Sequence, residues 1–365
     1  MKIRELIEFL EQIAPLSIQE SYDNCGLLVG TADSEITRAL ITLDCTEKVV
    51  QEAIENGCNL IISHHPVIFA GLKKLNGENY VERTVILAIK NNIAIYAVHT
   101  NLDNLWNGVN HKIAEKLGLI NCEILEPKKG VLLKLVTFVP IAHLANVKEE
   151  LFLAGAGNIG NYSGCSFTVS GMGTYTGNMN TNPYAGSVLK PHTEEESRIE
   201  MVFPSWLKEK VLQSLIRSHP YEEVAYDLYE LKNEYAQIGS GLIGYLPEKL
   251  NVDEFLALLK DRMQLQIIKY TKSSDAKINK VAICGGAGSF LLKKAMSAGA
   301  QAFVSSDFKY HEFFDAEERF MIADIGHFES EKFTKSLLSE LILKKFPTFA
   351  LLLSKSNTNP VNYYI

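Results

Sequence analysis

Short apolar runs alternate with amphipathic helical patterns in the first and last thirds of the chain, and this alternation constrains the fold more than any other feature. The predicted strands are residues 36–44, 59–63, 92–100, 278–286, 301–307 and 319–327. The predicted helices are residues 46–57, 82–91 and 289–299, with another that begins near Phe328. Strands that alternate with helices are typical of a largely parallel sheet covered by helices.

The middle of the chain departs from this alternation. It reads as strand, helix, strand, helix and strand, and it contains a stretch rich in Gly, Asn, Thr and Ser (155–187) that we expect to be loop or hairpin. We therefore predict an α/β fold whose two outer parts, 1–126 and 235–365, form two lobes of one core. Residues 127–234 are predicted to form a small inserted α+β domain.

Composition and charge exclude several classes of protein. The 365 residues carry a net charge of −7, and no aromatic–basic stripe is present, so nucleic acid is not an expected partner. Glu5, Glu8 and Glu11 interrupt the apolar start, and no apolar run is long enough to span a bilayer. The six cysteines are scattered without a CxxC pair, which suits a reducing compartment. We expect a cytoplasmic protein with no membrane partner.

Polar clusters follow four of the predicted strands. They are SHHP (63–66), HTNLDN (99–104), SSDFKYH (305–311) and GHFESE (326–331). In open α/β sheets, ligands bind outside the carboxyl ends of the strands. These four junctions are therefore the first place to expect a site.

SHHP contains His64 and His65 next to each other. Adjacent residues in a regular strand point to opposite faces, but a twisted strand end can turn both imidazoles into one cavity. One buried and one exposed histidine is an equally good interpretation of this motif alone.

The other two clusters have alternatives of their own. Asp103 is either an oxygen ligand or a helix N-cap or turn residue. His99 is a ligand, a support for a ligand or a proton carrier. His327 and Glu331 are four residues apart, so a helix would turn both toward one metal ion. Taken alone, this pair fits better as a surface helix start with acids near its positive end.

The combination favours metal binding. Three imidazoles and two carboxylates suit zinc, manganese, iron, cobalt or nickel. Five side chains are too many for one catalytic zinc with an open position, but they suffice for two divalent ions if one carboxylate bridges them. Two such ions would carry more positive charge than two carboxylates cancel, which favours an anionic ligand and lowers the pKa of bound water.

A Gly-rich segment, CGGAGSF (284–290), lies between a predicted strand and a predicted helix. Its N–H groups could cradle a phosphate, or it could be a tight turn packed on the sheet; the two interpretations are equally good. Asp307, Tyr310 and His311 are expected to line the same crevice. His311 is a candidate proton donor or acceptor, with helix capping as the alternative.

The clusters, in this order, resemble those of the GTP cyclohydrolase I type 2-like, or NIF-three-like, family. The matching segments are SYDNCGLLVG, ISHHPVIF, AVHTNLDN with GVN, ICGGAGSF, DFKYHEFFDA and IADIGHFESE. The middle part resembles the ferredoxin-like, PII/CutA-like insert of longer bacterial members through GNIGNYSGCSF, NPYAGS and SHPYEEVAYD. The resemblance covers nearly the whole chain.

The resemblance implies a dinuclear centre with His64, His65, Asp103, His327 and Glu331 as ligands, and we choose Glu331 as the bridge. It also implies a homohexamer and hydrolytic opening of the imidazole ring of GTP with release of formate. We expect zinc ions, a small anionic ligand or nucleotide as substrate, and His99 and His311 as proton carriers. The alternative is a metal-binding regulatory or partner-binding protein without turnover.

Overall fold

The computed structural model describes residues 1–273 and 277–364. The chain divides into two compact units, which are Met1–Pro127 with Gln237–Ile365 (the core unit) and Lys128–Ala236 (the insert unit). The predicted fold class is confirmed, because the core unit holds two largely parallel sheets covered by helices and the insert unit is a small α+β domain.

The first sheet of the core unit has five strands in the order β1-β4-β3-β2-β15. Their bounds are β1 (Gly26–Val29), β2 (Ala39–Thr42), β3 (Leu60–Ser63), β4 (Ala94–Ala97) and β15 (Leu351–Leu353). The strands from β4 to β15 are parallel, and β1 is antiparallel to β4. Every residue of β2, β3 and β4 is buried, as expected for parallel strands covered on both faces.

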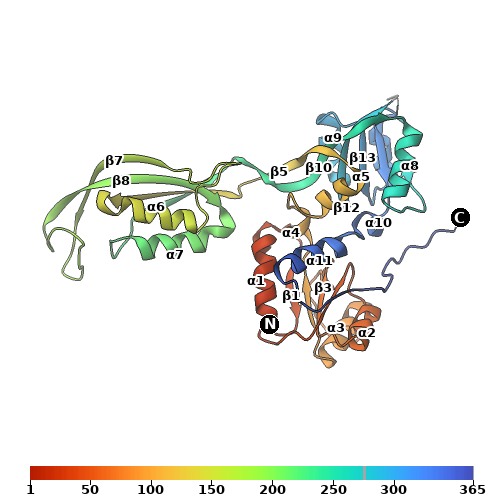
Figure 1. Cartoon of the computed structure of the whole chain (residues 1–365), viewed down its shortest axis with the longest axis horizontal. Helices are drawn as coiled ribbons and strands as arrows, with labels where there is room; N and C mark the ends of the chain where they lie inside the picture. Colours follow the sequence, from red (N-terminus) through yellow and green to blue (C-terminus); the bar gives the residue numbers. More distant parts are fainter. Residues whose placement is uncertain (274–276, 365) are drawn as a thin grey trace. The chain divides into compact units, whose positions relative to one another are not determined.

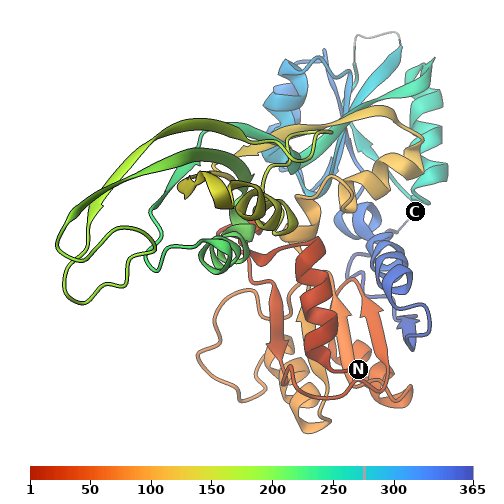
Figure 2. The same cartoon turned by 60° about the vertical axis from the view of Figure 1, so that its left-hand side comes forward.

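Helices cover both faces of this sheet because successive side chains point in opposite directions. Ile41 and Ile62 pack with α1 (Ile3–Ile13) and α11 (Thr334–Lys345). Leu40 and Ile61 pack on the other face with α2 (Glu47–Glu55) and α3 (Tyr80–Lys90). Figure 2 shows α1, in red, in front of the strands.

The second sheet has six strands in the order β11-β14-β13-β12-β10-β5. Their bounds are β5 (Ile120–Lys129), β10 (Glu234–Leu250), β11 (Lys269–Tyr270), β12 (Ile278–Ala287), β13 (Ala302–Ser306) and β14 (Met321–Asp324). β12, β13 and β14 are parallel, whereas β10 and β11 pair antiparallel with their neighbours β12 and β14. Because β5 lies in this sheet and β15 in the first, each sheet takes strands from both outer parts of the chain.

The helices of the second sheet also lie on two faces. α5 (Val109–Leu117) and α8 (Val252–Arg262) share the large apolar cluster that contains Val281 and Val304. α9 (Leu292–Ser297) packs on the other face against Ala282 and Phe303. The same large cluster includes side chains of α1 and α11, so one continuous core joins the two sheets of the core unit.

The insert unit has the element order β6, α6, β7, β8, α7, β9 and an antiparallel sheet in the order β7-β8-β6-β9, which is the ferredoxin-like arrangement. Its elements are β6 (Leu132–Pro140), α6 (Leu144–Leu153), β7 (Phe167–Thr176), β8 (Pro191–Pro204), α7 (Lys208–Ser218) and β9 (Tyr226–Leu231). Both helices lie along one face of the sheet, where their side chains share a core with the strands (Figure 1).

Of the two predictions for residues 155–187, loop or hairpin, the hairpin describes the second half of the stretch, although its strand was not delimited from the sequence. Residues 167–176 form strand β7, a ten-residue strand paired along its whole length with β8. Gly171 and Gly173 lower its intrinsic β-propensity, but the long partner strand supplies the hydrogen bonds that keep it extended. Among residues 1–273 and 277–364, no helix has both the length and the apolar character to cross a bilayer.

Candidate metal centre

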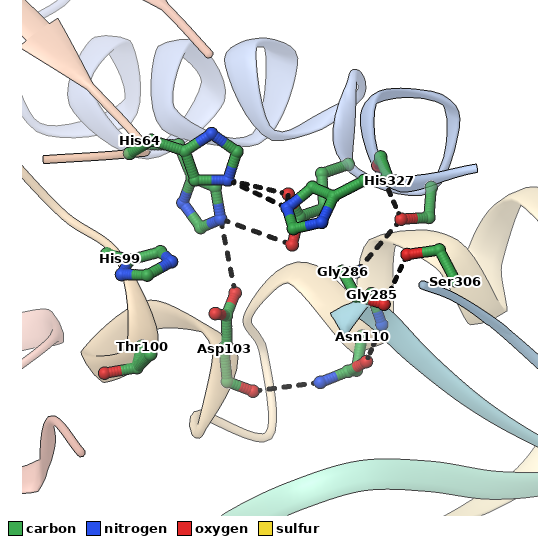
Figure 3. Close-up of polar contacts among 12 residues, drawn as sticks. His64, His99, Thr100, Asp103, Asn110, Gly285, Gly286, Ser306 and His327 are labelled. Carbon is green, nitrogen blue, oxygen red and sulfur yellow. Dashed lines mark hydrogen bonds and ion pairs between the residues drawn. The ribbon is translucent and has the colours of Figure 1, made fainter. Parts of the chain in front are cut away.

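The polar clusters meet between the two sheets of the core unit (Figure 3). His64 and His65 follow the end of β3, and His99 follows the end of β4 just before α4 (Thr100–Asp103). His327 and Glu331 begin and end α10 (His327–Glu331), which follows β14 of the second sheet. The carboxyl ends of strands from both sheets therefore supply one group of side chains, as the parallel topology favours.

Glu331 lies at the centre of this group. Its side chain is 2% exposed, and its Oε2 atom is 2.9 Å from Nε2 of His65 and 3.1 Å from Nε2 of His327. Its Oε1 atom is 3.8 Å from Nε2 of His64, and that same nitrogen is 3.5 Å from Oδ1 of Asp103. The two oxygens of Glu331 thus face two different sets of side chains.

Each histidine of the group is held by its outer ring nitrogen. The Nδ1 atoms of His64, His65, His99 and His327 lie 2.7–2.8 Å from Val98 O, Asp44 Oδ1, Asp23 Oδ1 and Asp307 Oδ2 respectively. An Nδ1–H that donates to an oxygen fixes the ring and leaves Nε2 as the ligand atom. This pattern, repeated four times, is the usual arrangement of metal-binding histidines.

Three of the four anchors are acids, and their role as anchors was not predicted from the sequence. Asp44 ends a predicted strand, Asp23 lies in the segment SYDNCGLLVG, and Asp307 was expected only to line the crevice. Asp44 also accepts a hydrogen bond from Thr358 at 2.5 Å, and Asp23 accepts hydrogen bonds from the N–H and hydroxyl of Thr100. Only the fold shows which imidazole each acid holds.

Two buried polar atoms at the centre of the group show that its side chains fit a cation. Among the described residues, Nε2 of His64 and Oδ1 of Asp103 are buried without a hydrogen-bond partner. Such atoms are costly to bury unless something else satisfies them. A metal ion between an imidazole nitrogen and a carboxylate oxygen would satisfy both.

Gly286 makes room for the central carboxylate. A Cβ atom at this position would lie 2.4 Å from Oε1 of Glu331, and the backbone has φ +64°, which favours glycine. The N–H of Gly286 donates to Oγ of Ser330, and the N–H of Gly285 donates to Oδ1 of Asn110. Because both of these N–H groups are used within the protein, they favour the tight-turn interpretation over a phosphate cradle at Gly285 and Gly286.

The carboxylates around His65 and His327 favour positive charge on these two side chains. Burial opposes the charged form of His65, but hydrogen bonds with Asp44 and Glu331 raise the pKa of His65 to about 10. Burial likewise opposes the charge on His327, but Asp307 and Glu331 raise its pKa to about 11. Metal ions compete with such protons for the same nitrogens.

The pKa values of the two carboxylates, Glu331 and Asp103, shift in opposite directions. Burial would raise the pKa of Glu331, but its bonds to the histidines, His327 foremost, hold it well below the ordinary value. Burial, followed by the charge of Glu331, raises the pKa of Asp103 to about 7. Asp103 is therefore the weakly held proton site of the group, and a cation beside it would displace that proton.

Three sets of side chains bring their ligand atoms within 4.8 Å of one another, and each can hold a metal ion. They are His65, His327 and Glu331; His64, Asp103 and Glu331; and His64, His65 and His99. Asp103 is the last residue of the one-turn helix α4, whose N-cap is His99, so the N-cap alternative does not describe it. His64 and His65 both turn toward Glu331, although they are adjacent in the chain.

His311 is not brought into this group. Its residue is exposed, and its ring packs against the rings of Tyr310 and Phe314. The placement does not support its expected role as a proton carrier at the candidate centre.

A cavity of about 400 Å³ opens beside His65 and His327. The anchoring acids Asp44 and Asp307 line it, as do Asn359 and Tyr363 from the C-terminal segment. Lys269 also lines the cavity, and its Nζ is 2.7 Å from Oδ2 of Asp324. The cavity gives a small molecule access to one side of the candidate centre.

Comparison with known proteins agrees with these features. The family Duf34/NIF3 (NGG1p interacting factor 3) matches residues 1–360. The chain is 41% identical over 341 residues to the GTP cyclohydrolase 1 type 2 homolog of Halalkalibacterium halodurans, covering 93% of this chain and 91% of that relative. It is 35% identical over 366 residues to the protein of the same name from Bacillus subtilis, covering 99% and 98%.

A solved structure is similar to this chain over its full length. The crystal structure of a Bacillus cereus protein related to NIF3 superposes with a TM-score of 0.88 at 36% identity, covering 100% of this chain and 99% of that one. The resemblance found in the sequence motifs is confirmed by a match that spans both units. The chain belongs to the Duf34/NIF3 family.

Proposed function

We propose that the core unit holds two divalent metal ions that share Glu331, and that it hydrolyses a nucleotide or another phosphorylated heterocycle. The observation that carries the proposal is that two sets of ligand atoms meet at this one carboxylate. His65 and His327 lie against its Oε2, whereas His64 and Asp103 lie on the side of its Oε1. A carboxylate with different partners on its two oxygens is suited to bridge two ions.

The donor set favours zinc. Imidazole nitrogens with carboxylate oxygens suit zinc, and also manganese, iron, cobalt and nickel. Every imidazole of the set already has its outer nitrogen bound to a carbonyl or a carboxylate, which strengthens its Nε2 as a ligand. Divalent ions held here would supply Lewis acidity and lower the pKa of a nearby water molecule.

His99 is the side chain that we propose as the proton carrier. Its Nδ1 is bound to Asp23, and its ring lies 5.3 Å from those of His64 and His65, centroid to centroid. Burial would raise the pKa of Asp23, but the bonds from His99 and Thr100 lower it below the ordinary value. Asp23 therefore stays charged and orients the ring of His99 through Nδ1.

The sequence favoured an anionic substrate because two metal ions would leave a surplus of positive charge. The structure does not support that argument, so the proposed substrate class rests on another one. Two divalent ions bring four positive charges, but Asp23, Asp44 and Asp307 add to the two predicted carboxylates, so the expected surplus of positive charge disappears. Support for a nucleotide comes instead from the GTP cyclohydrolase 1 type 2 homolog name of the relatives and from the cavity beside His65 and His327. An anionic group would be recognised by direct contact with the ions.

The test is turnover by the full chain reconstituted with zinc or manganese. GTP, other nucleoside triphosphates and phosphorylated heterocycles are the substrates, and release of formate or phosphate is the readout. We expect turnover that disappears with a chelator, returns with added metal and is absent in Glu331→Gln. A metal-loaded protein that leaves the whole panel unchanged would contradict the proposed hydrolase.

A regulatory metal-binding protein is the second candidate, and the insert unit favours it, because this unit has a core and a cavity of its own. Under this alternative, metal stabilises the fold without turnover. Saturating zinc that raises the melting temperature while the substrate panel stays unchanged would select this candidate over the hydrolase.

We also propose that the chain forms a homohexamer, as the resemblance implies. Light scattering coupled to gel filtration measures the assembly directly. A mass close to six times 40.7 kDa is expected, and a monomer at micromolar concentration would contradict it.

A further inference from the structure

The insert unit contains a cavity of about 630 Å³, which the proposed hydrolase does not use. Phe138, Glu196 and Arg198 line it from the strands of the sheet. They alternate with Val139, Ile199 and Met201, whose side chains pack under α6 and α7. The cavity therefore lies on the face of the sheet opposite to the two helices.

A buried carboxylate faces this cavity. Glu196 is 8% exposed, and its Oε1 accepts a hydrogen bond of 2.7 Å from the hydroxyl of Tyr221 rather than from a lysine or arginine. Burial and this bond raise the pKa of Tyr221, so the phenol keeps its proton and donates. Among the described residues, no ion pair joins Glu196 to a cationic side chain, and such a buried carboxylate is costly unless a ligand supplies the positive charge.

Strand β7, which pairs with β8 beside Glu196, has two glycines next to the Glu196 side chain. Gly171 lies directly opposite Glu196 in the ladder of β7 and β8. A Cβ atom on Gly173 would lie 2.0 Å from Oε2 of Glu196. The glycines of β7, which lower its strand propensity, thus leave the space in which this carboxylate sits.

Three tyrosine rings form a wall of the cavity. The ring of Tyr221 lies 6.0 Å from that of Tyr175 and 5.8 Å from that of Tyr184, centroid to centroid. The hydroxyl of Tyr175 donates to Ala185 O at 2.8 Å, and that of Tyr184 lies 3.0 Å from Nε2 of His143. Because the hydroxyls are occupied, the rings are held in place, and the faces of aromatic rings attract cations.

The remaining charges around the cavity are mainly acidic. Glu222 and Glu223 line it together with Glu196, and Arg198 is the basic side chain among the described lining residues. Arg198 is bound by Glu200, with its Nε 3.1 Å and its Nη2 3.0 Å from the same carboxylate oxygen. Its charge is therefore offset by an acid that does not line the cavity.

We propose that this cavity binds an organic cation, with an ammonium group against Glu196 and the tyrosine rings and an apolar body along Phe138 and Val169. A metal ion would need several oxygen or nitrogen ligands at one point, whereas one buried carboxylate with aromatic faces suits an ammonium group. The proposal concerns the insert unit alone and does not depend on the metal centre.

The test compares a charged probe with its uncharged analogue on the full chain. Choline and 3,3-dimethylbutan-1-ol have the same shape, but only choline is charged, and tyramine serves as a second ammonium probe. Binding is followed by calorimetry and by NMR of the tyrosine rings. We expect choline or tyramine to bind, and the neutral alcohol to bind about tenfold more weakly than choline or not at all.

Variants separate the carboxylate from general effects on the fold. Glu196→Gln keeps an acceptor for Tyr221 and should weaken binding of the ammonium probe about tenfold. Glu194→Gln on the same strand is the control, because Glu194 pairs with His192 and does not line the cavity, and it should bind like the parent protein. Tyr184→Leu changes a side chain that is 47% exposed, so it tests the ring wall if Glu196→Gln does not fold.

Several results would overturn the proposal. Equal binding of choline and the neutral alcohol would show a merely apolar pocket. Inorganic phosphate binding more tightly than either ammonium probe would show that Arg198 dominates. Failure of both ammonium probes to bind, or unchanged binding in both Glu196→Gln and Tyr184→Leu, would equally contradict it.

Discussion

Nε2 of His65 lies 2.9 Å from Oε2 of Glu331, although the two residues are 266 positions apart in the chain. One follows a strand of the first sheet and the other ends a helix after a strand of the second sheet. The contact thus joins the two halves of the core unit at one buried carboxylate. Each prediction below follows from the side chains gathered around that carboxylate.

Replacing Glu331 with Gln should abolish binding of both ions. The amide keeps the size of the side chain but removes the negative charge that faces His64, His65 and His327. Metal content after reconstitution, measured by elemental analysis, should fall to background. Asp261→Asn, an exposed acid on α8, is the control and should leave the metal content unchanged. Full occupancy in Glu331→Gln would refute the proposed bridging role of Glu331.

Gly286→Ala should lower the free energy of unfolding more than the same substitution at Gly299. Gly299 has a similar positive φ of +74° but no atom within 4 Å of an added Cβ, so Gly299→Ala measures the backbone cost alone, about 1 kcal/mol. At Gly286 the added Cβ also meets Oε1 of Glu331, which should cost about 1–3 kcal/mol more. Urea unfolding of the two variants measures the difference. Equal loss of stability would show that Glu331 moves away without penalty.

Asp307→Asn should weaken metal binding roughly 10- to 100-fold, the usual effect of losing an anchor behind a metal-binding histidine. Asp307 holds Nδ1 of His327 at 2.7 Å, and its φ of +59° is one that Asn tolerates, so the backbone should not change. Competition with a chelating dye measures the affinity. Asp315→Asn, an exposed residue nearby, is the matched control, and an equal effect in both variants would argue against the anchoring role.

Metal binding should release protons and strengthen as the pH rises. In the metal-free chain the pKa values of His65 and His327 are raised to about 10 and 11, so both rings are protonated at neutral pH. An imidazole must be neutral to bind metal, and Asp103, whose pKa is raised to about 7, must lose any proton that it holds. Near neutral pH, binding should therefore displace about two to three protons per chain, and a higher pH removes this competition. Calorimetry in buffers of different ionisation enthalpy counts the protons. Affinity that is flat or falls from mildly acidic to mildly alkaline pH would contradict these protonation states.

The α/β class and the positions of the polar clusters could be predicted because both depend on local pattern. Buried runs such as 59–63 and 301–307 predict strands, and polar residues just after them must lie at the carboxyl edge of a parallel sheet. The four-residue spacing of His327 and Glu331 likewise predicts a shared helix face. These arguments need no knowledge of which strands are neighbours.

What could not be predicted depends on neighbours that are distant in the chain. Nothing local shows that β5 pairs in the second sheet or that β15 returns to the first. The anchors are hidden for the same reason, since Asp23 holds His99 from 76 positions away and Asp44 holds His65 from 21. The choice between loop and hairpin stayed open for β7, because a propensity argument does not include the space that its glycines leave for the side chain of Glu196.

The most direct test of the account is a crystal of the zinc-loaded protein with diffraction data collected on both sides of the zinc absorption edge. Two anomalous peaks are expected in each chain, one on the side of Glu331 that faces His65 and His327 and one on the side that faces His64 and Asp103. A single peak, or peaks away from Glu331, would contradict the claim that this carboxylate joins two metal ions.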